Sequence, residues 1–203
     1  MIGKQVRQRI EAAIKSVERG TRAEFVAVIA RRADDYDETS YTVVLVAAIL
    51  AGLIVGQLVP WASGGNILLA QPTAFLVAFV VMRFTPFGVR LTPWSSREHA
   101  ARRLARLIFL ERGLASTDEH CGVMFFVAQG ERYVEIIADR GIDQKVDATS
   151  WQKVVDDFTA AIRVGDVETG FVGAISTLGD ILAKHYPAPD GNPNEISNRL
   201  IEI

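Results

Sequence analysis

The 203-residue sequence has a single cysteine, Cys121, and only three histidines. One thiol excludes a disulfide framework and a multi-cysteine zinc site, and it is typical of a protein from a reducing compartment. Neither sign of charge is in excess, since 22 Lys and Arg stand against 24 Asp and Glu, and this balance argues against a nucleic-acid partner. The sequence also lacks nucleophile-elbow, phosphate-loop and dinucleotide-binding motifs. Hydrophobic residues make up 49% of the chain, which is enough for a packed core.

Charge is missing altogether from residues 39–82. A helix needs about 20 apolar residues to cross a bilayer, so this block is long enough for two spans. Pro, Gly and Asn at 60–66 end one helix and permit a tight reversal. The sequence therefore predicts a transmembrane hairpin over 39–82, with spans at about 41–59 and 67–84. A buried soluble hairpin is the less favoured alternative, because so small a domain cannot cover two helices that are apolar all round.

The charges that flank this block predict its orientation. Arg31 and Arg32 precede it and Arg83 and Arg90 follow it, whereas the turn has no Lys or Arg. The positive-inside rule then predicts an integral membrane protein with both termini in the cytoplasm. We expect Arg83, Arg90 and Arg97 at the membrane surface, where anionic headgroups attract arginine. A solvated helix face is the alternative interpretation.

Small residues recur every fourth position in both predicted spans. They are Ala48, Gly52 and Gly56 in the first span and Ala70, Ala74 and Ala78 in the second. Small residues on facing seams permit the close backbone approach that holds helices together in lipid. We expect the two seams to pack against each other within one chain, although the glycine seam could instead form a homodimer face.

Residues 1–38 and 83–203 together have the size of one domain, which the hairpin interrupts. Periodicity predicts helices over 6–17, 95–113, 149–165 and 166–185, and strands over 24–30, 123–127 and 133–138. The second helix is expected to bury a stripe that contains Leu104, Leu107 and Ile108. The expected fold class is α/β, a mixed β-sheet flanked by helices with an inserted two-helix transmembrane hairpin. Residues 187–203 are expected to form an irregular tail, in which 200–203 could add to a sheet edge or bind a partner.

Several short motifs, in this order, resemble the TPM domain family in its membrane-anchored branch. They are Val28-Ile29-Ala30, the strand over 122–127, Glu131-Arg132, the loop over 139–142, Trp151 and the tail over 190–196. The resemblance implies an α/β sandwich. It also implies the divalent-metal binding and phosphatase activity of some relatives, and a role in maintaining membrane complexes in photosynthetic ones. Soluble relatives have a Gly-Tyr-Gly-Leu-Glu-type loop where this chain has residues 138–143.

The candidate site is the loop after the second strand of the predicted β-hairpin. Asp139, Asp143 and Asp147 recur there every four residues, and Asp118 precedes the first strand of that hairpin. Clustered carboxylates suit Ca²⁺ or Mg²⁺, although aspartates that cap helices and turns are the favoured interpretation. Arg140 could bind a phosphate or pair with a carboxylate.

Two functions follow from these patterns. The favoured one is an interaction or assembly-assisting module at the cytoplasmic membrane surface, with the lipid bilayer and a membrane protein or a second copy as partners. The alternative is a divalent-metal-dependent phosphatase that acts through the loop over 139–147.

Overall fold

The computed structural model describes residues 3–58, 64–85, 87–117, 120–188 and 200–203. The chain forms two compact units: residues 1–33 with 100–203 make an α/β unit, and residues 34–99 make a helical unit.

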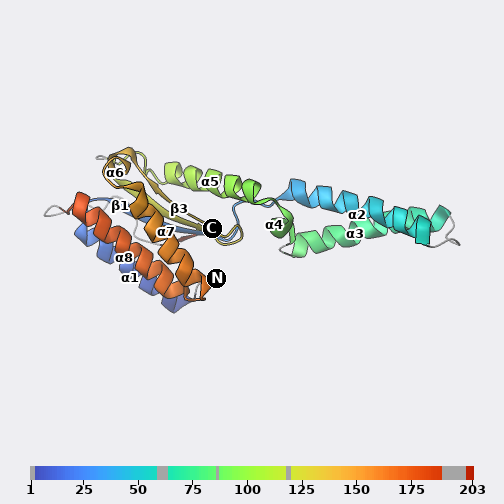
Figure 1. Ribbon diagram of the computed structural model, residues 1–203, viewed down its shortest axis with the longest axis horizontal. Helices are drawn as coiled ribbons and strands as arrows, with labels where there is room; N and C mark the ends of the chain where they lie inside the picture. The colour runs from blue at the N-terminus through green and yellow to red at the C-terminus, as the bar shows by residue number, and fades with distance from the viewer. Residues whose placement is uncertain (1–2, 59–63, 86, 118–119, 189–199) are drawn as a thin grey trace. The chain divides into compact units, whose positions relative to one another are not determined.

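A four-stranded mixed sheet is the centre of the α/β unit (Figure 1). Its order is β3-β2-β1-β4, formed by β1 (Glu24–Ala30), β2 (Gly122–Ala128), β3 (Tyr133–Ala138) and β4 (Ile201–Glu202). β1 runs parallel to β2 and β4, whereas β2 and β3 form an antiparallel hairpin. The prediction of a mixed sheet flanked by helices is confirmed.

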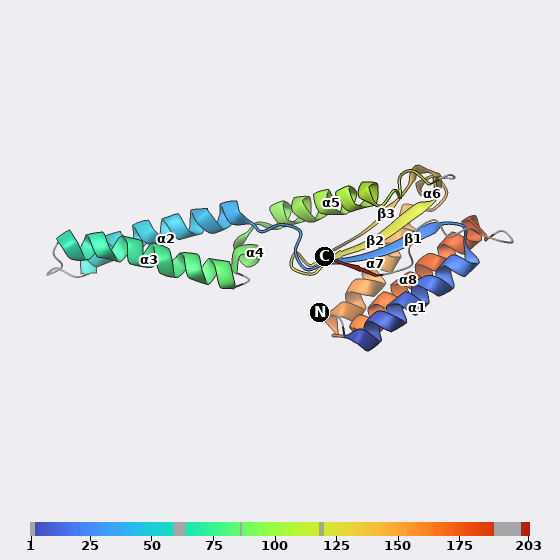
Figure 2. The same cartoon turned by 180° about the vertical axis from the view of Figure 1, so that it is seen from behind.

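The two faces of the sheet are covered unequally (Figures 1 and 2). Three helices, α1 (Lys4–Gly20), α7 (Ala148–Arg163) and α8 (Val167–His185), pack on the face that holds Phe25 and Phe125. Phe125, Phe158 and Phe171 meet edge to face there, with ring centroids 4.9 to 5.9 Å apart. One helix, α5 (Trp94–Glu111), covers the other face, where its residues from Ala101 onward contact Val28 and Phe126. β1 and β2 are buried on both faces, which explains their unbroken apolar sequences.

The C-terminal residues differ from the predicted irregular tail. β4 pairs with β1, and Leu200 is only 1% exposed. Ile203 N donates to Ile29 O at 3.0 Å, and Arg31 N donates to Ile203 O at 2.8 Å. A two-residue strand is too short to show an alternating pattern, so the sequence could not decide between pairing of 200–203 with a sheet edge and binding of a partner. The tail motif over 190–196 lies outside the described residues.

The helical unit contains α2 (Asp37–Leu58), α3 (Gly64–Phe84) and the short α4 (Phe87–Leu91), and α2 packs along α3. Residues Asp37–Val55 form a helix that is long and apolar enough to cross a membrane. The apolar helix Leu69–Phe84 is shorter than the 18 residues that such a span requires. The prediction of two spans is thus supported for one helix. Pro72 lies within α3, and residues 59–63 of the predicted turn lie outside the described residues.

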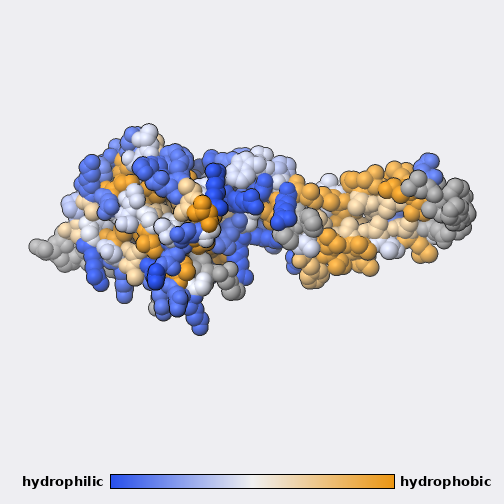
Figure 3. All heavy atoms as spheres, turned by 60° about the horizontal axis from the view of Figure 1, so that its bottom comes forward, coloured by the Kyte–Doolittle hydropathy of each residue, from blue (hydrophilic) through white to orange (hydrophobic). Residues whose placement is uncertain are grey.

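Apolar side chains cover the outside of this unit (Figure 3). Among the residues of α2 whose burial is described, the least exposed are Val44, Ala48 and Gly52, and those of α3 include Ala70, Ala74, Ala78 and Met82. The burial of Gly56, the third residue of the predicted glycine seam, lies outside the description. A methyl group built on Gly52 would lie 2.4 Å from Gln71 Nε2, so this glycine accommodates the glutamine side chain. The outward side chains of α2 are large and between 49 and 59% exposed: Leu45, Val46, Ile49, Leu50, Leu53 and Ile54.

Candidate functional site

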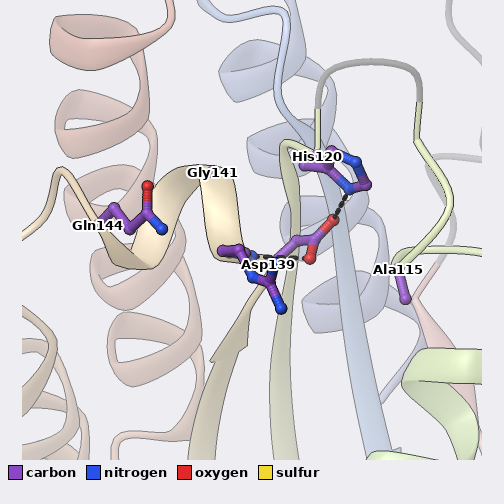
Figure 4. A pocket seen from close by; sticks show the side chains of 6 residues that line it. Ala115, His120, Asp139, Gly141 and Gln144 are labelled. Carbon is purple, nitrogen blue, oxygen red and sulfur yellow. Dashed lines mark hydrogen bonds and ion pairs between the residues drawn. The ribbon is translucent and has the colours of Figure 1, made fainter.

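An open pocket of about 470 Å³ lies at the end of the sheet where β2 begins and β3 ends (Figure 4). The antiparallel register Val123↔Ala138 brings the residues before β2 next to those after β3. Among the described residues, six line the pocket: Ala115, His120, Asp139, Arg140, Gly141 and Gln144.

His120 and Asp139 are paired in this pocket. His120 Nδ1 lies 3.0 Å from Asp139 Oδ2, and Asp139 Oδ1 accepts a hydrogen bond from Arg140 N at 2.7 Å. The imidazole and the carboxyl group are placed to share one hydrogen, and the tautomer of His120 sets which of them donates it. The imidazole is mostly exposed, at 66%, whereas the carboxylate is 14% exposed. An imidazole that is oriented by a carboxylate in this way is able to transfer protons.

His120 also has a strained backbone. Its φ is 52°, in the left-handed region that few non-glycine residues adopt. Such a conformation persists only where the surrounding structure imposes it. Residues of this kind cluster at functional sites.

Contacts behind the pocket fix its walls. Cys121 N donates to Thr117 Oγ1 at 3.0 Å, and Tyr186 Oη donates to the Gly141 carbonyl oxygen at 2.5 Å. Gly122 lies against the Leu114 carbonyl group, since an added methyl would stand 2.2 Å from that oxygen. These contacts connect the loop to the end of α8 and to the segment that follows α5.

The four predicted metal ligands do not form a ligand set among the described residues. Asp139 caps α6 (Arg140–Asp143), Asp143 is an exposed residue of that helix, and Asp147 precedes α7 and accepts from Thr149 Oγ1 at 2.5 Å. Asp118 lies outside the described residues. No three Asp, Glu, His or Cys side chains in the described ranges are placed to hold one metal ion. The contacts of Asp139 agree with the capping interpretation, whereas the Asp147 side chain accepts no backbone hydrogen bond from the first turn of α7. A Ca²⁺ or Mg²⁺ site on this loop stays a prediction.

The arginines predicted at the membrane surface, Arg83, Arg90 and Arg97, lie in the helical unit. Arg83 and Arg90 are exposed, at the ends of α3 and α4. Arg97 is partly buried, and its guanidinium carbon lies 5.4 Å from the centroid of the Trp94 ring.

A buried acid on α1 was not among the predicted site residues. Both carboxylate oxygens of Glu18 are buried without a hydrogen-bond partner among the described groups. Burial, followed by repulsion from Glu24, raises the pKa of Glu18 to about 8, while Lys15 opposes the shift. Glu18 follows Ile14 by one helical turn, so its place on the buried stripe of α1 was the available signal.

Comparison with known proteins identifies part of the chain. Residues 87–181 match the model of the TPM domain. This segment begins at α4 and ends within α8, so it contains the β2–β3 hairpin and the six described residues of the pocket. It does not include α1 and β1, although β1 pairs with β2 along its whole length.

A solved structure has the same fold as the chain. It is the NMR structure of BA42 protein from the psychrophilic bacterium Bizionia argentinensis, with a TM-score of 0.62 and 15% sequence identity over 100% of this chain and 96% of that one. At this identity the likeness concerns the fold alone. No curated protein matches the chain.

Proposed function

We propose that this protein is a membrane-anchored module that holds its TPM-like α/β unit at the cytoplasmic surface of a bilayer and assists the assembly of membrane components. The observation that carries the proposal is the exposure of large apolar side chains along α2, from Leu45 to Ile54. A water-soluble protein rarely exposes so long an apolar surface. Lipid acyl chains are as apolar as these side chains, so a bilayer would cover this surface without the unfavourable hydration that water imposes on it.

In this proposal α2 and α3 both cross the bilayer. The helix over Leu69–Phe84 is shorter than a typical span, and local thinning of the bilayer accommodates such a mismatch at a modest cost. Arg31 and Arg32 on one flank and Arg83 and Arg90 on the other support, by the positive-inside rule, an orientation with both termini on the cytoplasmic side.

Accessibility of introduced cysteines tests this topology. Gly3→Cys, Gly65→Cys and Ser95→Cys are each treated with a membrane-impermeant maleimide on sealed cells, with the wild-type protein as control because Cys121 is buried. Two spans predict that only the Gly65→Cys protein is labelled from outside. A single span predicts that Gly65→Cys and Ser95→Cys are labelled together, and a protein that does not insert is labelled at none of the three.

An assembly role predicts a defined neighbour for the hairpin within the membrane. A photoreactive residue at Leu53, an outward position of α2 that is 59% exposed, is expected to capture one membrane protein or a second copy in fixed stoichiometry. The same residue at the exposed Ser176 of α8 is the control. Captured lipid alone at Leu53 would contradict the assembly role while leaving the anchor intact.

The second candidate function is a phosphatase that acts at the pocket. The pairing of His120 with Asp139, beside Arg140, is the observation that favours it. Because the described aspartates do not gather around a common point, we derive no metal-dependent step. Saturable phosphoester turnover that is abolished by Asp139→Asn and retained by Asp143→Asn would establish the enzyme. Background turnover that is unaffected by Asp139→Asn would exclude it.

A further inference from the structure

The outward face of α5 carries arginines and leucines side by side. Arg103 and Arg106 are exposed there, and Leu107 and Leu110 are 51 and 66% exposed. The opposite side of the helix, with Ala101, Ala105 and Ile108, is buried on the sheet. This outward face therefore forms a surface of its own, defined by Arg103, Arg106, Leu107 and Leu110.

The leucines of this surface are not required by the fold. The prediction that Leu107 belongs to the buried stripe is wrong, because the stripe follows Ala101, Ala105, Ile108 and Phe109, and Leu107 is turned away from it. Two exposed leucines one turn apart, beside exposed arginines on the same face, fit a helix face that lies in a membrane interface. Arginine stems can lie along apolar surface while the guanidinium groups reach phosphate oxygens.

The chain keeps α5 within reach of the bilayer. Only the segment from Phe84 to Trp94 separates the end of α3 from the start of α5. Even fully extended, it would span no more than about 35 Å. The segment over 83–112 also holds seven arginines but only two glutamates, Glu98 and Glu111. Anionic headgroups attract this net positive charge.

We infer that the outward face of α5 docks on the anionic headgroup surface of the membrane that holds α2 and α3. This inference rests on the proposed membrane anchor and adds a second contact of the protein with the same bilayer. Arg103 and Arg106 bind headgroup phosphates, and Leu107 and Leu110 enter the boundary with the acyl chains. A second copy of the chain is a poorer occupant, since a two-fold contact through this face would bury the arginines of both copies, and the surface as defined contains no carboxylate to pair with them.

Depth-dependent fluorescence quenching tests the inference on the full-length protein in lipid nanodiscs. An environment-sensitive fluorophore is attached at Leu110→Cys, with Val46→Cys on α2 as the anchor control and Ser176→Cys on α8 as the solvent control. In discs containing phosphatidylglycerol, spin-labelled lipids are expected to quench the fluorophores at positions 110 and 46, and to leave the one at 176 unquenched. In discs of phosphatidylcholine alone, quenching at position 110 is expected to fall and that at position 46 to persist.

Charge variants provide the matched comparison. Replacing both Arg103 and Arg106 with glutamine is expected to lower the ratio of docked to undocked α5 roughly thirtyfold, at the usual strength of two arginines near an anionic surface. The double lysine replacement at these positions should retain docking, and Lys153→Gln with Arg163→Gln on α7 should leave it unchanged.

The outcomes distinguish failure of the proposed membrane anchor from failure of the docking of α5. If the fluorophore at position 46 is not quenched, the membrane anchor itself is wrong. If position 46 is quenched but position 110 reports water in anionic discs, the anchor stands and docking of α5 is wrong. An apolar signal at position 110 without lipid quenching would identify a protein contact and overturn the inference.

Discussion

The Glu18 carboxyl group is buried beside Glu24 and receives no hydrogen bond from the described groups. Its pKa rises from 4.5 to about 8 on folding, mainly because burial disfavours the charged form. Between pH 4.5 and about pH 8, Glu18 therefore keeps its proton in the folded protein and releases it in the unfolded chain. The stability that this proton contributes is complete below pH 4.5 and is lost as the pH rises through 8.

Glu18→Gln should therefore stabilise the protein at alkaline pH only. We expect a gain of about 1–2 kcal/mol at pH 8.5, reduced from the full linkage value because the side chain is only partly buried, and no gain at pH 4.5. Chemical denaturation at the two pH values measures the difference. Glu11→Gln, which removes an ion pair with Arg7, is the control and should give no alkaline gain. A benefit of Glu18→Gln that is the same at both pH values would contradict this account.

Asp139 is expected to act as a structural cap whether or not the pocket has an activity. Asp139→Ala removes the cap of α6 and the partner of His120, and should cost about 1 kcal/mol. Asp143→Ala, at an exposed position of α6, should change the free energy of unfolding by less than about 0.5 kcal/mol. Thermal unfolding with and without millimolar Ca²⁺ measures both effects. Stabilisation by Ca²⁺ that disappears in Asp143→Ala would instead identify the aspartates as ligands.

At the level of elements, the start of β2 depends on a glycine for close packing. A side chain at Gly122 would collide with the backbone of Leu114, and a backbone carbonyl cannot move aside as a flexible side chain can. Gly122→Ala should destabilise the protein by about 1–3 kcal/mol, as overpacking does. Gly173→Ala in α8 has open space around it and should stabilise by up to about 1 kcal/mol. Equal effects of the two variants, measured by denaturation, would refute the packing argument.

The elements that the sequence predicted are those with long apolar patterns. The apolar strands over 24–30 and 123–127 and the returning strand over 133–138 lie within one or two residues of β1, β2 and β3. α6 and β4 have four and two residues, too few for any period to be recognised. The prediction that Leu107 is buried is wrong because burial on a helix depends on the angle of the residue around the helix axis, and Leu107 lies outside the buried stripe.

The candidate site was only partly predictable. Asp139 was identified from its place after a strand, but its partner was not. The available signal was the hairpin itself, because antiparallel strands bring the residue before the first strand near the residue after the second. The left-handed backbone of His120 depends on tertiary structure, so no local pattern announces it.

At the scale of the whole molecule, the α/β unit is built from two distant pieces of chain. β1 pairs with β2 along seven residues, and α1 packs on α8, so neither piece buries its apolar surface alone. Residues 34–99 contribute to the other unit. The α/β unit should therefore fold without them.

Replacing residues 34–99 with a flexible Gly/Ser linker should give a soluble, folded domain with dispersed amide NMR signals. The control is the fragment 100–203, which lacks α1 and β1 and should remain unfolded because β2 loses its parallel neighbour. A folded control fragment would show that the N-terminal piece is dispensable.

The pairing of Glu24 with Gly122 also has a consequence for biosynthesis. About a hundred residues separate the two strands, which takes a ribosome roughly 5–20 s at ordinary rates of translation. During that interval a nascent chain carries β1 without its neighbour, and the apolar helices emerge before the neighbour does. In the proposed topology, insertion of the hairpin thus precedes closure of the sheet. A chain that misses the bilayer would present a free strand and two apolar helices to chaperones and proteases at the same time.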